Sequence, residues 1–373
     1  MKRYLRPLGL LSGATASEAT EAGLALPLAG GTLAYALVEV IERSESRIER
    51  RIVAVGDGRF GSLRVGAPEA SPPPNPADRG EGMRNEASET LPPDGGGLGG
   101  GAARARKPLV MGVVNVTPDS FSDGGDFLDA RRAIRHAEAM LRAGAAIIDI
   151  GGESTRPGAL PVDSAEEIRR VVPVIAGIRT SAEAAGAVIS IDTRNAATMR
   201  AALEAGVGMI NDVSALTHDP AAVGVVTTSD ATVVLMHMQG GPRTMQVAPA
   251  YVDVVLDIYD YLEARIAACE AAGIDRARII VDPGIGFGKT VVHNLQLLSQ
   301  LSLFHGLGLP ILIGVSRKGF VAHLAEGEAS GRRLPGSLAA GLVALSQGAQ
   351  ILRVHDVTET VQAVRIAEAI AEG

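Results

Sequence analysis

The feature that most constrains the fold is a pattern that recurs eight times between Lys107 and Gly373. In each repeat, a short run of mainly aliphatic residues leads into polar or glycine residues, and amphipathic stretches lie between the runs. Short runs that are apolar almost throughout are typical of parallel strands buried on both faces. The runs cover residues 109–115, 146–150, 187–191, 208–211, 231–235, 278–281, 310–313 and 351–354.

Eight strand–helix units within 267 residues predict an α/β fold of the TIM (β/α)8 barrel type, which needs about 250 residues. Helices are expected over 129–143, 165–185, 196–205, 251–272 and 358–371. An open, doubly wound sheet is the alternative, although no G-x-G-x-x-G follows the first strand. In a barrel, the residues that follow the strands meet at one end, and catalysis takes place there.

A linker separates this predicted domain, residues 107–373, from a small N-terminal module. Gly and Pro make up 15 of the 39 residues from 67 to 105, and Val, Ile and Phe are absent. Such a segment cannot bury enough apolar surface to fold, so we expect 67–106 to be flexible. Residues 1–66 are predicted to form a small α/β module, with strands or a short helix over 33–43 and 51–55. The module carries no catalytic motif, which favours a packing or dimer-contact role over a second binding function.

Charge and cysteine content exclude several classes of protein. The net charge is −7, which argues against a general nucleic-acid binder. Cys269 is the only cysteine, so an intrachain disulfide and a cysteine metal cluster are excluded, and we expect it to pack within a helix. No run reaches the roughly 18 apolar residues of a membrane span, and the N-terminal apolar run is too short for a secretory signal. We therefore expect a soluble, cytoplasmic protein with small-molecule partners.

Polar side chains that follow the predicted strands form two sets. Asp192, Asn211, Asp282 and Lys318 supply carboxylates, an amide and an ammonium that can bind the donor and acceptor edge of a flat heterocycle. Taken singly, Asp192 or Asp282 could simply cap a helix, and Asn211 could be a turn residue. Their shared place in a barrel favours a site.

The second set is suited to an anion. Thr155, Arg156, Arg353 and His355 carry hydroxyl, guanidinium and imidazole groups that bind phosphoryl oxygens. Asn115 and Asp123 lie in a polar loop and offer the oxygen ligands that Mg²⁺ prefers.

Two further features have plainer interpretations. The glycine-rich segment 284–288 could be only a turn between a strand and a helix. His237, between two methionines, is expected to be a packed histidine rather than a ligand.

The domain resembles the dihydropteroate synthases, enzymes of folate biosynthesis. The strings that carry the resemblance are MGVVNVTPDSFSDGG (111–125), DIGGESTRPGA (149–159), SIDT (190–193), INDVSAL (210–216), LMHMQGGPRTMQ (235–246), DPGIGFGKT (282–290), GVSRKGF (314–320) and LRVHDV (352–357). They are long, and they occur along most of the domain, whereas residues 1–105 resemble no family. The resemblance implies a transferase that joins 6-hydroxymethyl-7,8-dihydropterin diphosphate to 4-aminobenzoate with Mg²⁺, giving 7,8-dihydropteroate and diphosphate.

The resemblance also implies a role for each site residue. The pterin would be held by Asp192, Asn211, Asp282 and Lys318 between Met236 and Phe287. The diphosphate would be held by Asn115, Thr155, Arg156, Arg353 and His355. The aminobenzoate would be held by Phe121, Pro157, Ser316 and Lys318. The metal would be held by Asn115 and Asp123, and the groups acting in catalysis would be Asn115, Arg156, Lys318, Arg353 and His355.

Two other functions remain open on the sequence. A methyltetrahydrofolate:corrinoid methyltransferase shares the carboxylates at the pterin edge but binds no diphosphate, so the basic residues argue against it. A non-catalytic pterin-binding paralogue would have lost loop or anion-binding residues, and none is missing here. The resemblance further implies a homodimer, with the predicted helices over 337–347 and 358–371 as candidate contacts.

Overall fold

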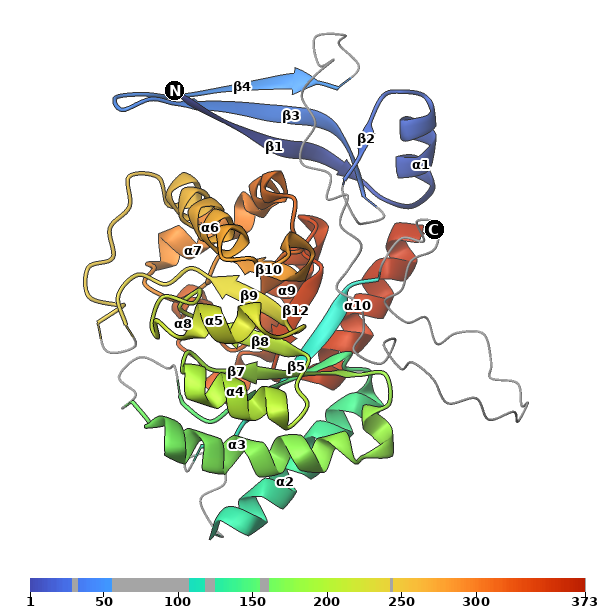
Figure 1. Cartoon of the computed structure of the whole chain (residues 1–373). Coiled ribbons are helices and arrows are strands. Elements are labelled where there is room, and N and C mark those ends of the chain that lie inside the picture. Colours follow the sequence, from blue (N-terminus) through green and yellow to red (C-terminus); the bar gives the residue numbers. More distant parts are fainter. Residues whose placement is uncertain (29–32, 56–106, 118–124, 155–160, 242–243, 373) are drawn as a thin grey trace, which may run out of the picture.

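The structure is a computed structural model that describes residues 1–28, 33–55, 107–117, 125–154, 161–241 and 244–372 (Figure 1). Within these ranges the chain forms a small N-terminal sheet and a barrel of strands and helices. The predicted linker lies outside the described residues. None of the described helices is both long and apolar enough to cross a membrane.

The N-terminal module is an antiparallel sheet with one helix. Its elements are β1 (Lys2–Leu11), α1 (Gly13–Glu21), β2 (Leu26–Pro27), β3 (Ala34–Arg43) and β4 (Ile48–Ala54). The central strand, β3, pairs with β1 along one edge and with β4 and β2 along the other. The segments predicted as strands or a short helix are therefore strands. Because side chains alternate across a sheet, one face packs as a separate small core around Val38 and Val40, and the other turns Tyr4 and Ile41 into the barrel's core.

Eight parallel strands form the barrel, which confirms the predicted fold. They are β5 (Leu109–Asn115), β6 (Ile147–Gly151), β7 (Val188–Asp192), β8 (Met209–Asp212), β9 (Thr232–Met236), β10 (Ile279–Asp282), β11 (Leu312–Ile313) and β12 (Ile351–Val354). Their order is β10-β9-β8-β7-β6-β5-β12-β11, and a bridge between Val281 and Ile311 joins the two ends. Five strands begin and end one residue later than predicted, so Asp192 and Asp282 are the last residues of their strands rather than loop residues.

Helices surround the strands (Figure 1). They are α2 (Gly125–Ala143), α3 (Ser164–Arg179), α4 (Ala196–Glu204), α5 (Ala222–Thr227), α6 (Val254–Ala271), α7 (Val291–Ser299), α8 (Gly319–Leu324), α9 (Leu334–Ser346) and α10 (Val357–Glu372). Local sequence sets several boundaries: Asp163 caps α3, Asp253 caps α6, and Thr290 with His293 forms a capping box on α7. The 3₁₀ helix η5 (Leu301–Leu307) follows α7. Cys269 is buried within α6, as expected for a packing residue.

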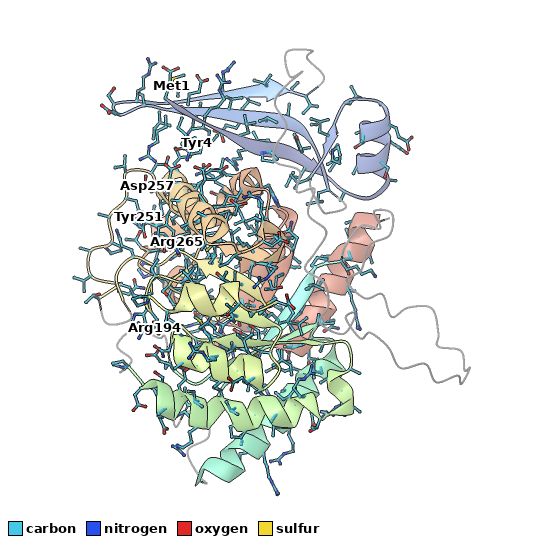
Figure 2. All side chains as sticks on the ribbon, in the orientation of Figure 1. Met1, Tyr4, Arg194, Tyr251, Asp257 and Arg265 are labelled. Carbon is cyan, nitrogen blue, oxygen red and sulfur yellow. The ribbon has the colours of Figure 1, made fainter. Side chains whose placement is uncertain are left out.

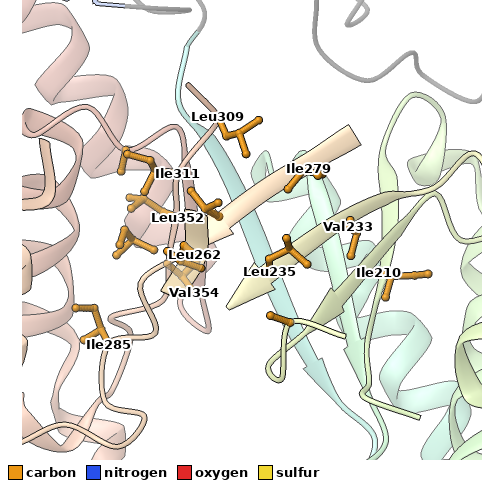
Figure 3. Packing of buried hydrophobic residues seen from close by; sticks show 14 of the residues in the cluster. Ile210, Val233, Leu235, Leu262, Ile279, Ile285, Leu309, Ile311, Leu352 and Val354 are labelled. Atoms are coloured by element: carbon orange, nitrogen blue, oxygen red, sulfur yellow. The ribbon is translucent and has the colours of Figure 1, made fainter. Parts of the chain in front are cut away.

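The period of two along each strand divides the barrel into an outer and an inner set of side chains. The outer set packs against the helices as one large cluster; Figure 3 shows Ile210, Val233, Leu235 and Ile279 from neighbouring strands within it. Near the start of the strands, the inner set is an apolar layer to which all eight strands contribute: Met111, Ile147, Val188, Met209, Val234, Ile280, Leu312 and Ile351. This layer fills the lower part of the barrel with side chains, as in other barrels of this type.

Two residues further along, the inner positions of several strands become polar. Asp149, Ser190, Asn211 and Asp282 occupy them, and all four are buried. Arg353 occupies the corresponding position of β12. The same alternation that fills the base of the barrel with aliphatic groups therefore brings charged and amide groups together at its carboxyl end.

Candidate active site

A carboxylate and a guanidinium form the centre of this polar layer. Arg353 Nε donates to Asp149 Oδ2 at 2.7 Å, and Asn211 Nδ2 donates to the same oxygen at 2.9 Å. Arg353 Nη2 donates to Asp192 Oδ2 at 2.7 Å. One guanidinium thus holds two carboxylates from neighbouring strands, and Asp149 fixes the amide of Asn211. These hydrogen bonds set the orientation of the carboxylates and of the amide.

Burial dominates the electrostatics of Asp192. Loss of hydration raises the pKa of Asp192 to about 7, although Arg353 opposes this rise and the charge of Asp149 adds to it. A carboxyl group with this pKa exchanges its proton near neutral pH. A ligand that donates hydrogen bonds to Asp192 would select the ionised form.

Asp282 ends β10 and begins a glycine-rich turn. Its Oδ1 accepts a hydrogen bond from Gly284 N at 2.7 Å, and burial raises its pKa. Gly284 has φ +72°, and a Cβ at this position would lie 2.0 Å from the carbonyl oxygen of His237. Only glycine fits here, because both the backbone conformation and the space exclude a side chain.

The turn presents an aromatic ring to a lysine. The Nζ of Lys318 lies 4.0 Å from the centre of the Phe287 ring, and Gly286, with φ +85°, leaves room for the lysine stem. Burial lowers the pKa of Lys318 to about 8, and the charges of Asp282 and Asp192 counteract part of this effect. Lys318 is therefore a cation of reduced hydration that lies over the Phe287 ring and interacts with the charges of Asp282 and Asp192.

Ser316 and His355 lie together at the ends of adjacent strands. His355 Nδ1 lies 3.1 Å from Ser316 Oγ, and His355 N donates to the same oxygen at 3.2 Å. Between Ser316 and Lys318, Arg317 adopts φ +58°, and its guanidinium forms an ion pair with Asp356. A non-glycine residue in this conformation is strained, and such strain is common at functional sites.

Five of the predicted site residues lie outside the described residues: Phe121, Asp123, Thr155, Arg156 and Pro157. The base of the loop with Thr155 is described. There, Glu153 pairs with Arg194 at 2.9 Å, and buried Glu167 accepts hydrogen bonds from Thr193 and Thr198. These contacts tie the end of β6 to the segment that follows Asp192.

The predicted site residues that the structure describes lie at the carboxyl end of the barrel. The neighbours of Asn115 show how its side chain is placed. A Cβ at Gly151 would lie 3.9 Å from Asn115 Oδ1 and 3.6 Å from the Cβ of Asp192, so only a glycine separates the two side chains. Asn115 therefore turns its amide oxygen toward the polar layer. Across the described ranges, no three His, Cys, Asp or Glu side chains are grouped so that they could hold a metal ion.

Sequence reasoning missed Asp149 and Lys289. Lys289 is buried, and its Nζ donates to Phe287 O at 2.9 Å and lies 3.0 Å from His237 Nδ1. His237 is packed between Tyr251 and Tyr261, as expected, and burial with the charge of Lys289 lowers its pKa to about 2. Lys289 thus braces the turn that carries Phe287. Both missed residues lie inside the strings that carry the resemblance. The barrel register would have shown that Asp149 points inward, whereas the burial of Lys289 depends on contacts of the turn that precedes it.

Comparisons with known proteins agree with this geometry. A profile of pterin binding enzymes matches residues 111–355. These residues include the polar layer and every predicted site residue, and the chain therefore belongs to the pterin-binding enzymes.

Matches to individual proteins identify the family within the pterin-binding enzymes. Dihydropteroate synthase from Escherichia coli strain K12 is 48% identical over 262 residues, which cover 70% of this chain and 91% of that protein. The enzyme from Neisseria meningitidis serogroup B is 48% identical over 269 residues, which cover 71% and 93%. A structure of Xanthomonas albilineans dihydropteroate synthase with 4-aminobenzoic acid is 47% identical, with a TM-score of 0.66, and covers 71% of this chain and 93% of that one. A complex of this enzyme with 7,8-dihydropteroate is 44% identical, with a TM-score of 0.64, over 71% and 94%. Within its class, the chain is a dihydropteroate synthase and hence a transferase.

Proposed function

We propose that this chain joins 6-hydroxymethyl-7,8-dihydropterin diphosphate to 4-aminobenzoate, giving 7,8-dihydropteroate and diphosphate for folate biosynthesis. The observation that carries the proposal is the buried set of Asp192, Asn211 and Asp282 at the carboxyl end of the barrel, oriented by hydrogen bonds to Arg353, Asp149 and Gly284 respectively. The ligands named for the solved Xanthomonas albilineans structures support the same chemistry.

The pterin would lie against this set. Its ring N–H and amino groups donate hydrogen bonds, which the carboxylates of Asp192 and Asp282 can accept, whereas Lys318 can donate to its carbonyl or ring nitrogen. Met236, which is buried, and Phe287 would form the apolar walls. A smaller or different ring would leave buried polar groups of the site without hydrogen-bond partners. Such a ring would bind more weakly, and the site would therefore select the pterin.

The reaction needs a good leaving group more than it needs a strong base. The bond between the exocyclic methylene carbon and oxygen breaks, the diphosphate leaves with the electron pair, and the electron-rich dihydropterin delocalises the positive charge. The aryl amine nitrogen then attacks this carbon and loses a proton. Because the aryl amine is already neutral, no strong general base is required.

Basic groups would stabilise the departing charge. Two nitrogens of Arg353, Nε and Nη2, are engaged by carboxylates, which leaves Nη1 for a diphosphate oxygen. His355 beside Ser316, together with Asn115, Thr155 and Arg156, completes the proposed set.

Mg²⁺ is part of the proposal. This cation keeps several waters and usually binds through one or two protein oxygens together with substrate phosphates, so the amide oxygen of Asn115 fits such a site. Asp123 is the second proposed contact. When bound with the diphosphate, Mg²⁺ would neutralise part of its charge.

The aminobenzoate would bind above the pterin. We expect Phe121 and Pro157 to cover it, with Ser316 and Lys318 on the opposite side. Loops that close over both substrates would keep water from capturing the cation.

We also expect a cytoplasmic homodimer. The surface of α9 and α10 supports this assembly, because Val343, Ile366 and Ile370 are exposed there. Apolar groups on two adjacent helices are typical of an interface between copies. Sedimentation of the purified chain would measure the assembly state.

The proposal is tested by a coupled assay with the pterin diphosphate and 4-aminobenzoate, with and without Mg²⁺. Dihydropteroate should form only when both substrates and the cation are present. Arg353→Ala should reduce turnover at least about 100-fold, because it removes a donor to the leaving group. Near-normal turnover of this variant would refute the diphosphate assignment.

A further inference from the structure

At the start of α6, two carboxylates each have one oxygen bound to backbone N–H groups and the other bound to an arginine. Asp253 Oδ1 accepts hydrogen bonds from the backbone N–H groups of Val255 and Leu256, both at 3.1 Å, and so caps the helix. Its other oxygen, Oδ2, accepts from Arg50 Nη2 at 2.9 Å. Arg50 lies in β4 of the N-terminal module. The cap of α6 is therefore also a contact of the module.

Asp257, one turn further along, repeats this arrangement. Its Oδ2 accepts from the N–H groups of Val252 and Asp253, at 2.9 and 3.3 Å, and so folds the preceding segment back onto the helix. Its Oδ1 forms an ion pair with Arg43 Nη2 of β3 at 2.7 Å. Each arginine of the module thus occupies the one oxygen that the backbone leaves free.

The segment that these carboxylates hold reaches the pterin site. Tyr251 precedes Val252, and its hydroxyl donates to the carbonyl of Gly288 at 2.7 Å. Gln246 Nε2 donates to the carbonyl of Gly286 at 2.7 Å. Both hydrogen bonds hold the turn that carries Phe287, the residue whose ring contacts Lys318 Nζ. Figure 2 shows Tyr4 of the module, with Asp257 and Tyr251 below it on the barrel.

We propose that Arg43 and Arg50 of the N-terminal module are positioning residues for the pterin site. They fix Asp253 and Asp257, which hold Tyr251 against the turn with Phe287, so the module sets the order of a wall of the binding site. This inference rests on the proposed function for the identity of the ligand. The family profile begins at Met111, so this support comes from outside the part of the chain that the family shares.

Other contacts keep the module in place when these two arginines are changed. Lys2 pairs with Asp260 and Glu263 further along α6. Tyr4 packs edge-on against Tyr259, with ring centres 5.4 Å apart. These contacts make it possible to alter Arg43 and Arg50 without detaching the module.

The first experiment compares full-length variants in steady-state assays with the pterin diphosphate as the varied substrate. In Arg43→Gln/Arg50→Gln, KM for the pterin should rise about three- to tenfold, whereas kcat should stay within twofold, because the reacting groups are untouched. The control, Lys2→Gln, removes ion pairs to the same helix away from its start, and its KM should match wild type. An unchanged KM in the double variant, or an equal rise in the control, would overturn the proposal.

A double-mutant cycle tests the route. Tyr251→Phe removes the hydroxyl that binds Gly288, and it should raise KM to a similar extent. If the arginines act through Tyr251, the combined variant should show little further rise. If the rise in KM of the combined variant equals the product of the separate rises, the arginines and Tyr251 act independently, and the proposed route through Tyr251 is wrong.

Hydrogen exchange separates this inference from the proposed function. Amide exchange over residues 284–289 should be faster in Arg43→Gln/Arg50→Gln than in wild type, and it requires no turnover. A wild-type chain without synthase activity would refute the proposed function alone. Unchanged exchange in these residues would refute the positioning role.

Discussion

Asp149→Asn is the sharpest test of the electrostatics of the site. Asp149 is fully buried, and one oxygen of its carboxylate accepts from both Arg353 and Asn211. An asparagine amide oxygen can take the same place, so the substitution removes a negative charge and leaves the shape nearly unchanged. The charge of Asp149 is one of the causes that raise the pKa of Asp192. Removing it should lower that pKa.

The magnitude follows from the geometry. Raising the pKa of Asp192 from 3.8 to about 7 corresponds to about 4 kcal/mol in favour of the protonated form, and burial, the largest cause, is unaffected by the substitution. The two carboxylates contact one guanidinium, and charges about 5 Å apart interact by about 1 kcal/mol in water and about 3 kcal/mol at an effective dielectric constant of 20. Because Arg353 compensates part of this repulsion, we expect the pKa of Asp192 to fall by about one.

The assay is kcat/KM for the pterin diphosphate between pH 5 and 9, which reports ionisations of the free enzyme. Activity should require ionised Asp192, so its acid limb should have a midpoint near pH 7 in wild type and near pH 6 in Asp149→Asn. Comparing variants cancels any ionisation of the substrate. Asp275→Asn, at an exposed helix cap, should leave the midpoint unchanged. An unchanged or higher midpoint in Asp149→Asn would refute the reasoning.

Two further predictions concern stability. The pKa of Asp192 is raised from 3.8 to about 7 in the folded state, so its contribution to stability is fully present below about pH 4 and is lost progressively as pH rises to about 7. In urea unfolding, the stability of Asp192→Asn relative to wild type should therefore increase as pH rises from about 4.5 to about 7, and a constant difference over this range would contradict the expectation. Gly284→Ala should lower Tm by at least about 4 °C, because a left-handed alanine costs about 1–2 kcal/mol before its contact with His237 is counted. Gly186→Ala, with φ +78° and open space around it, provides the control, and equal losses would exclude the steric explanation.

The barrel was predictable because its strands are mainly apolar on both faces. Each run of aliphatic residues predicted one strand, and eight strand–helix units predicted a closed barrel. Two of the predicted strands end one residue early, at 191 and 281, because each aliphatic run stops at the first polar residue, Asp192 or Asp282. The backbone ladder continues through that residue, as Asp192 shows by pairing with Asn211. Polar residues that seemed to belong to loops are therefore held by the sheet.

The parts of the site that escaped prediction depend on long-range contacts. Asp149 lies between isoleucines within a strand, and nothing local shows that it faces Arg353, which is far away in sequence. Lys289 follows a glycine-rich turn, and nothing local shows that the fold buries it against His237 and the Phe287 carbonyl. The role of the module also depends on distant pairs, such as Arg50 with Asp253. Periodicity identifies which residues can point inward, whereas only the assembled barrel decides which of them meet.

The alternation of side chains within the barrel limits how this protein can change its length. Deleting one residue within a strand would exchange the inner and outer positions beyond it, placing a carboxylate among the helices and an isoleucine among the substrates. No single substitution could repair such a change. Gains and losses of residues should therefore accumulate between strands, whereas the strands keep constant lengths. A library of random deletions selected for growth without added folate would recover survivors almost entirely from the connecting segments.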